Sequence, residues 1–365
     1  MNPRRASVVV TRSAAMLAII AASVGCASDG RPGGSVQAEP EVTSIEMNEM
    51  RERAFTALVE LTADTVPNVR ANAVEALEAS SVRVDAVLRR SLKDPNPGVR
   101  SIAAVVAGRS ERTAFVEDLR GLRNDPSPYV RAAASFALHR FGVPADLTPI
   151  SWMLFAEDAR ARGYAAYLLG ELGDESALLM LQESASDPMD WARPVSARLA
   201  QLQIAEAMYR LGYQQAIQEV RAALYPATVE DLEATALAVQ ILGEVGDKPS
   251  IDQLVYLTAR TDGRGNAMPA EIQMASAVAL AKMGQSGGLF IAEEFLDAPT
   301  ETVRAQAAYG LGELGGRGSL ADLEALLADE SSMVRVAAAS AVVRLTDRLA
   351  RESLGRPGTA RATGG

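Results

Sequence analysis

The chain of 365 residues has a single cysteine, a single histidine and few aromatic residues, which make up 5 % of it. One cysteine cannot form a disulfide within the chain, and one Cys with one His leaves too few ligands for a structural zinc site, so no metal or cofactor is predicted. Scarce aromatics with abundant Ala, Leu and Val suit the narrow contact stripes of packed helices better than a large sheet. The net charge of −10 repels phosphate backbones, so no nucleic-acid partner is expected.

The N-terminal 25 residues have the pattern of an export signal. Three basic residues precede an apolar stretch at residues 14–24: Arg4, Arg5 and Arg12. This stretch of roughly 11 residues is much shorter than the ~20 that span a bilayer, which favours a signal over a transmembrane helix. It ends in Ser23-Val24-Gly25-Cys26, which resembles the bacterial lipobox, with Ser23 where that motif usually has Leu.

The lipobox resemblance implies a signal peptide at residues 1–25 and a lipid on Cys26. Residues 26–43 are rich in Gly, Pro and Ser and are predicted to form a flexible tether. The protein is therefore expected to be exported and lipid-anchored at the cell envelope, on the periplasmic side. Ala27, rather than Asp, follows the cysteine, which implies the outer membrane where the cell has one. Ordinary cleavage near Ala22 or Ala27, leaving a free thiol, is the alternative.

A repeated motif runs through the rest of the sequence. Val-Arg followed by an alanine-rich segment recurs, and counting back from the closing glycines places degenerate copies with Gln201, Thr235 and Gln273 in the arginine slot. The nine slots are residues 70, 100, 131, 162, 201, 235, 273, 304 and 335. Six of the eight spacings lie between 30 and 34 residues, a regularity that unrelated domains would not produce.

Each repeat contains two helical patterns. In the second pattern, apolar residues recur at i, i+3 and i+4, as they do from Val130 to Phe141. Asp-Pro pairs separate the first helix from the second, and glycines end six of the second helices: Gly142, Gly173, Gly212, Gly246, Gly284 and Gly315. The periodicity predicts an all-α solenoid of nine antiparallel helical hairpins over residues 44–348, followed by a disordered tail at 349–365.

Asp-Pro, Val-Arg, an alanine-rich helix and a closing Gly-Glu-Leu-Gly resemble HEAT repeats, most closely the short type named after phycobilisome lyases. The resemblance implies a right-handed superhelix whose second helices line the concave side. It also implies a structural ladder that joins neighbouring hairpins: Asp94, Arg100, Asp125, Arg131, Arg162, Arg304, Asp329 and Arg335. Since a hairpin in such an array contacts only its neighbours, polar residues of the first helix, including Arg51, are expected to cap an open end.

The sequence contains no convincing catalytic constellation, and the chain is predicted not to be an enzyme. A Ser-His-Asp arrangement would have to use His139, which falls on an exposed helix position. Some relatives of the short HEAT type attach or isomerise bilins, so bilin lyase-like activity is a remote alternative. The export signal argues against it, because those relatives act in the cytoplasm, and a repeat does not by itself carry a chemistry.

The middle of the array differs from its ends. The arginine slot is lost there, insertions occur near residues 187–194 and 261–269, and 11 of the 17 aromatics fall between Tyr129 and Tyr225. Insertions in solenoids often mark the binding face, and aromatics with Arg are common at binding hot spots. The candidate partner-binding residues lie on non-core faces of second helices: Arg140, Tyr167, Tyr209, Arg210, Glu244 and Lys282.

These features predict a scaffold at the bacterial cell envelope that binds a protein or peptide segment in its concave groove. One alternative is a structural or accessory subunit of an envelope enzyme or assembly machine. Another is that aromatics such as Trp152, Phe155 and Tyr164 are simply core and the middle repeats have diverged without a function.

Overall fold

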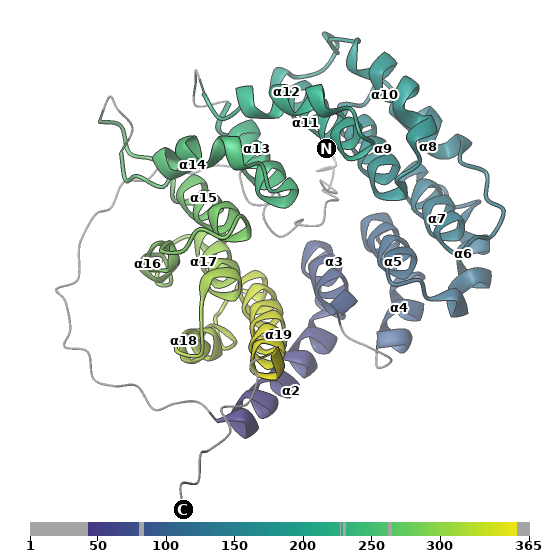
Figure 1. Cartoon of the computed structure of the whole chain (residues 1–365). Coiled ribbons are helices and arrows are strands. Elements are labelled where there is room, and N and C mark those ends of the chain that lie inside the picture. Colours follow the sequence, from purple (N-terminus) through teal and green to yellow (C-terminus); the bar gives the residue numbers. More distant parts are fainter. Residues whose placement is uncertain (1–42, 80–83, 227, 229–230, 262–264, 356–365) are drawn as a thin grey trace, which may run out of the picture.

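The computed structural model describes residues 43–79, 84–226, 228, 231–261 and 265–355 (Figure 1). The predicted signal peptide, the lipidation site Cys26 and the tether up to residue 42 lie outside these residues. Within them, no helix is both long enough and apolar enough to cross a membrane. No strand forms in the described ranges, where Thr261 and Ala267 make one isolated antiparallel bridge.

The predicted all-α solenoid of nine hairpins is confirmed. The first helices of the hairpins lie on the outside of the array: α2 (Ser44–Leu61), α4 (Asp85–Ser91), α6 (Val116–Leu122), α8 (Thr148–Leu154), α10 (Leu178–Ala185), α12 (Ile217–Ala222), α14 (Ile251–Leu257), α16 (Leu289–Glu294) and α18 (Ser319–Leu326). The second helices lie on the inside: α3 (Pro67–Ala76), α5 (Pro97–Arg109), α7 (Pro128–Arg140), α9 (Ala159–Leu172), α11 (Pro194–Arg210), α13 (Leu232–Val245), α15 (Ala270–Lys282), α17 (Glu301–Leu314) and α19 (Ser332–Gly355).

The helix ends follow from local chemistry. Proline is the first residue of α3, α5, α7 and α11, where its missing N–H costs nothing. Gly173 and Gly246 end α9 and α13 at φ values of 73° and 69°, a region in which side chains other than glycine are strained. Gly315 differs from the expectation, since its backbone after α17 is extended, with φ −74°.

The C-terminal boundary also differs from the prediction. The solenoid was expected to end at residue 348, but α19 continues to Gly355. Good helix formers occupy this extension, and Arg348 lies 3.8 Å from Glu352, one turn further along. Residues 356–365 of the predicted tail lie outside the described residues.

The residues of the proposed ladder lie where consecutive hairpins meet. Arg100 donates two hydrogen bonds of 2.9 Å to the carboxylate of Asp125 in the next hairpin, and Arg304 binds Asp329 in the same way. Asp94 accepts the corresponding pair from Arg70, and Arg162 contacts Asp187 at 2.9 Å. Each such pair also fixes a loop, because the arginine donates to carbonyl groups that precede its own helix, as Arg100 does to Asp94 and Pro95.

Within the described residues, two ladder arginines form no ion pair with a carboxylate of the next hairpin. Arg131 and Arg335 donate to the carbonyls of their own preceding loops, those of Asp125 and Pro126 and of Asp329 and Glu330. The degenerate slots keep part of this function with neutral side chains: Thr235 Oγ1 donates to the Ala223 carbonyl and Gln273 Nε2 to that of Met268.

The array is not open, which corrects the expectation of a polar end cap. Figure 1 shows the hairpins curving round until the last inner helix, α19, lies against the first hairpin, and α19 packs extensively on α2. Arg51 of α2 donates a 2.8 Å hydrogen bond to Asp347 of α19, and Arg53 pairs with Glu324 of α18. The nine hairpins therefore form a closed ring, and the first hairpin has a neighbour on both sides.

Candidate functional site

The candidate site is the inner face of the ring. One position, nine residues after the arginine slot, carries a charged side chain in eight successive inner helices: Arg109, Arg140, Glu171, Arg210, Glu244, Lys282, Glu313 and Arg344. From Arg140 onward the sign of the charge alternates strictly. In the first hairpin, Glu75 of α3 and Glu78 of the 3-10 turn that follows it (Leu77–Ala79) take the place of this residue and pair with Arg109.

Except for Arg140, each cation at this position pairs with an acid at or just after the end of the preceding inner helix. Arg109 reaches Glu75 at 3.3 Å and Glu78 at 3.4 Å, with only 5 % of its side chain exposed. The other pairs are Arg210 with Glu171 at 3.8 Å, Lys282 with Glu244, and Arg344 with Glu313 at 3.5 Å. These contacts tie neighbouring hairpins together on the inside, while the ladder ties them at the loops.

Tyrosines complete the inner face. The guanidinium of Arg344 lies 4.6 Å from the ring centre of Tyr309, whose hydroxyl is 3.4 Å from Lys282 Nζ. Tyr164 of α9 is buried and reaches across α7 to Ser101 of α5, with 2.8 Å between the two hydroxyl oxygens. Tyr164 also stacks with Tyr167.

Burial shifts the acid–base properties of this face. Burial raises the pKa of Glu75 to about 6, against the opposing charge of Arg109 and with a smaller contribution from Glu78. Burial is also the main cause that raises the pKa of Glu206, with Arg210 opposing the shift and Glu171 and Glu244 adding to it. On the inner face, burial therefore disfavours the charged forms of these two carboxylates.

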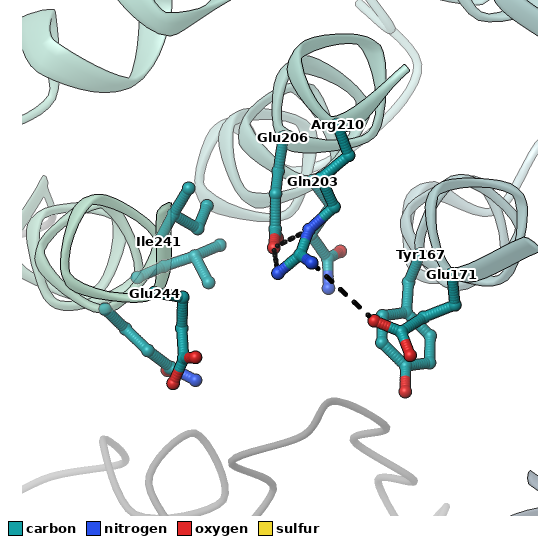
Figure 2. A pocket seen from close by; sticks show the side chains of 9 residues that line it. Tyr167, Glu171, Gln203, Glu206, Arg210, Ile241 and Glu244 are labelled. Atoms are coloured by element: carbon teal, nitrogen blue, oxygen red, sulfur yellow. Dashed lines mark hydrogen bonds and ion pairs between the residues drawn. The ribbon is translucent and has the colours of Figure 1, made fainter. Parts of the chain in front are cut away.

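A pocket opens on this face between α9, α11 and α13 (Figure 2). Its polar lining consists of Tyr167 and Glu171 from α9, Gln203, Glu206 and Arg210 from α11, and Gln240 and Glu244 from α13. Leu237 and Ile241 form its apolar wall. Figure 2 shows Arg210 between Glu206 and Glu171, with the side chains of α13 on the other side of the opening.

Glycines set how closely neighbouring inner helices pack. Four inner helices carry glycine one residue before the charged position, and a Cβ there would collide with the next inner helix. At Gly108, Gly243 and Gly312 this Cβ would lie 2.8 Å from an atom of an alanine. At Gly170 the corresponding distance is 3.1 Å. These glycines draw α5 to α7, α9 to α11, α13 to α15 and α17 to α19. At the alternate joints the same position holds a larger residue, Tyr209 on α11, and α11 packs much less closely on α13 than on α9.

The predicted partner-binding residues are only partly brought together. Arg210, Glu244 and Tyr167 line the pocket, and Lys282 binds Glu244 from the adjacent helix. Tyr167 was expected to be exposed, but it is largely covered and its hydroxyl is buried, because the inner face is tightly curved here.

The remaining two lie elsewhere. Tyr209 does not line the pocket and is half-buried. It lies near enough to Arg221 of α12 to make a small contribution to the raised pKa of that guanidinium, after the larger contribution of the hydrogen bond to Asp247. Arg140 is exposed and approaches Glu111 at 3.4 Å, beside exposed His139. Sequence reasoning missed Glu206, although it precedes Arg210 by four residues on one helix face, which is the spacing of an ion pair.

The repeated hairpins agree with a comparison of the sequence with known protein families. The model of the family described as HEAT repeats matches residues 117–200 and 290–356. Over these two segments the chain is similar to HEAT repeats. They include the ladder pairs of Arg162 with Asp187 and of Arg304 with Asp329, and the helical hairpins of the structure continue outside them.

No curated protein sequence matches the chain. Among solved structures, human deoxyhypusine hydroxylase in complex with glycerol is 17 % identical with a TM-score of 0.34, covering 82 % of this chain and 98 % of its own. The complex of CpcE and CpcF of phycocyanin lyase from Nostoc sp. PCC7120 is 16 % identical with a TM-score of 0.37, covering 88 % and 100 %. An engineered protein is 18 % identical with a TM-score of 0.33, covering 92 % and 99 %. Similarities of this size transfer no activity to this chain.

Proposed function

We propose that this helical-repeat scaffold is a non-enzymatic binding protein, lipid-anchored at the bacterial cell envelope, which holds a protein or peptide segment on its inner face. The observation that carries the proposal is the pocket between α9, α11 and α13, where polar side chains from three helices meet an apolar wall. The seven polar side chains offer hydrogen-bonding groups to a bound segment, and Leu237 and Ile241 add a small apolar contact. The charges along the inner helices would extend such a site over several repeats.

The envelope location is supported by the export signal and by the single cysteine at its end. A Cys26→Ser substitution is expected to move the protein from the detergent phase to the soluble fraction, because serine cannot carry the diacylglycerol that would anchor the protein through the Cys26 thiol. A wild-type protein that is already soluble, or whose N-terminus is not residue 26, would contradict the lipid anchor without affecting the binding proposal.

The binding proposal is tested by photo-crosslinking in the native envelope. A photoreactive amino acid at Gln240, in the pocket, is expected to capture one protein that mass spectrometry identifies reproducibly. The same group at Glu117, on the outer helix α6 with 82 % of its side chain exposed, is the matched control. Equal capture from both positions, or none from Gln240, would refute binding on the inner face.

One observation favours the accessory-subunit alternative. Several outer helices expose apolar side chains: Trp152 of α8 is 75 % exposed, and Leu179 of α10 and Phe290 of α16 are also exposed. Trp152 was considered as a core residue, whereas the structure buries only Tyr164 of that group. If the outer face docks on a larger assembly, Trp152→Ala will release the protein from that assembly while capture from Gln240 persists.

A further inference from the structure

One rim of the ring exposes an aromatic side chain in each of four consecutive hairpins. In the fourth to seventh hairpins, this side chain lies in the loop from the outer to the inner helix or in the last turn before that loop. The four residues, called the aromatic rim below, are each between 41 % and 66 % exposed: Phe155, Trp191, Tyr225 and Tyr256. Large aromatic side chains are mostly covered in a folded protein, so a row of exposed ones marks a surface for interaction.

The four loops lie along one edge of the ring. All outer helices run in the same direction, so the loops that follow them gather on the same side. Contacts between hairpins agree with this placement: Arg162 at the start of α9 lies 2.9 Å from Asp187 in the fifth loop, and Gln253 of α14 donates a 3.3 Å hydrogen bond to the Leu224 carbonyl in the sixth. The aromatic rim is therefore a row and not a set of scattered residues.

The fifth loop holds Trp191 at the surface in a defined conformation. Met189 is fully buried beneath this loop with φ 56°, a left-handed conformation that costs free energy in a residue other than glycine. Its N–H donates a 2.9 Å hydrogen bond to Asp187 Oδ1, and the guanidinium of Arg162 lies 5.1 Å from the centre of the Trp191 ring. Burial of Met189 and these contacts offset the strain, so the exposure of Trp191 is built into the loop.

The chemistry of the aromatic rim fits a membrane interface. Trp and Tyr are enriched at the level of lipid headgroups, where the ring meets apolar chains and the polar group stays hydrated. Among the described residues of the four loops and of the first turns after them, three exposed acids balance three exposed bases: Glu157, Asp158, Asp190, Arg160, Arg193 and Arg260. This edge therefore meets zwitterionic headgroups without the repulsion expected from the chain as a whole, whose net charge is −10.

The length of chain before α2 allows the contact. Residues 27–42 separate Cys26 from Thr43, and a chain of 16 residues reaches at most ~55 Å. Thr43 caps the start of α2 and so lies at the opposite rim, and α2 with its 18 residues is ~27 Å long. The segment is therefore long enough for a lipid on Cys26 to enter the same bilayer that the aromatic rim touches.

We propose that the aromatic rim rests on the lipid surface to which the chain is anchored. Trp191 and Tyr225 place their rings among the headgroups, and the balanced charges of the loops stay in the headgroup layer. The charged residues of the pocket lie in the last turns of their helices, at the opposite rim, so this orientation leaves them open to the solution: Glu171, Arg210 and Glu244. The inference rests on the envelope location in the proposed function and adds a second contact to the lipid anchor.

Photo-crosslinking of the full chain in the native envelope tests the contact. A diazirine amino acid at Trp191, and separately at Tyr225, is expected to form a phospholipid adduct that mass spectrometry detects on the corresponding peptide. The same group at Phe290, which is exposed at the start of α16 on the opposite rim, is the matched control and should form no lipid adduct. A protein adduct in place of lipid at Trp191 and Tyr225, no adduct at either, or equal lipid capture at Phe290 would overturn the inference.

Fluorescence of the acylated protein in vesicles of phosphatidylethanolamine and phosphatidylglycerol gives a second measurement. Trp152→Phe leaves Trp191 as the only tryptophan, and brominated phosphatidylcholine in the vesicles should cause loss of its emission. Trp152→Phe combined with Trp191→Phe and Phe290→Trp moves the only tryptophan to the opposite rim, where the same lipid should leave the emission unchanged. Tyr225→Asp added to the first variant should restore the emission of Trp191, because the new carboxylate would have to leave water. Equal quenching at both rims, or quenching that survives Tyr225→Asp, would contradict the contact.

The results separate this inference from the proposed function. If Trp191 contacts no lipid while Gln240 captures a protein, the binding proposal stands and the orientation on the membrane falls. If Cys26 carries no lipid but Trp191 still captures phospholipid, the anchor falls and the contact through the aromatic rim stands.

Discussion

Replacing Gly243 with alanine tests the packing that shapes the ring. Alanine is the better helix former by about 1 kcal/mol, so propensity alone predicts that Gly243→Ala stabilises α13. The structure predicts the opposite result. A Cβ at this position would lie 2.8 Å from both Cα and Cβ of Ala279 on α15, and a backbone atom cannot move aside cheaply. Overpacking of this kind costs about 1–3 kcal/mol, so after the gain in propensity a net loss of up to about 2 kcal/mol of unfolding free energy is expected.

Gly121 provides the matched control. It also lies in a helix, α6, but a Cβ there would have no neighbour within 4 Å. Gly121→Ala should therefore be neutral or stabilising by up to about 1 kcal/mol. Urea denaturation followed by far-ultraviolet circular dichroism gives both midpoints under the same conditions. If the two variants shift the midpoint in the same direction, α13 and α15 are not in close contact and the proposed alternation of tight and open joints is wrong.

Two further predictions concern ion pairs. Arg100→Ala removes both hydrogen bonds to Asp125, whose side chain is only 7 % exposed, and should lower the unfolding free energy by about 3 kcal/mol. Arg120→Ala, which breaks the exposed pair with Glu117, should lower it by less than about 1 kcal/mol. Similar decreases in the two urea midpoints would show that the ladder does not hold the hairpins together. Because the pKa of Glu75 is raised to about 6, its protonated form favours the folded state, and this stabilisation is present below about pH 4.5 and lost as the pH rises through 6. A shift of this size corresponds to about 2 kcal/mol, so Glu75→Gln should flatten the decline in unfolding free energy between pH 4.5 and 7.5, and an unchanged pH profile would contradict the burial of this carboxylate.

The hairpin array could be predicted because its determinants are local and repeated. Proline at the start of α5 and α7, the left-handed glycines and the 3.6-residue periodicity each act within one hairpin, and nine copies reinforce the same register. One pair between hairpins could not be predicted in this way. Arg221 on α12 binds Asp247 in the loop after α13, and neither residue occupies a ladder slot.

The candidate site was predictable only in outline. Periodicity placed Arg210 and Glu244 on the inner face, where the structure has them, but it could not say how far neighbouring helices separate. That separation depends on side-chain volume at facing positions. Tyr167 illustrates the limit, because the same helical position would be exposed on a flat array and is covered where α5 and α9 approach each other across α7.

Closure of the ring depends on the rotation between neighbouring hairpins, added over all nine of them. The sequence of a single repeat therefore does not reveal it. A long outer helix offers a signal in retrospect: α2 buries Met47, Met50 and Phe55, more apolar surface than a solvent-facing cap requires. That surface is covered by α19, which packs on α2 more extensively than α3 does. In an open solenoid the terminal hairpins are the least stable because each lacks one neighbour. Here the first and last hairpins supply that neighbour to each other, so the removal of either exposes two apolar interfaces, and the charges of the inner face stay at a fixed spacing around the pocket.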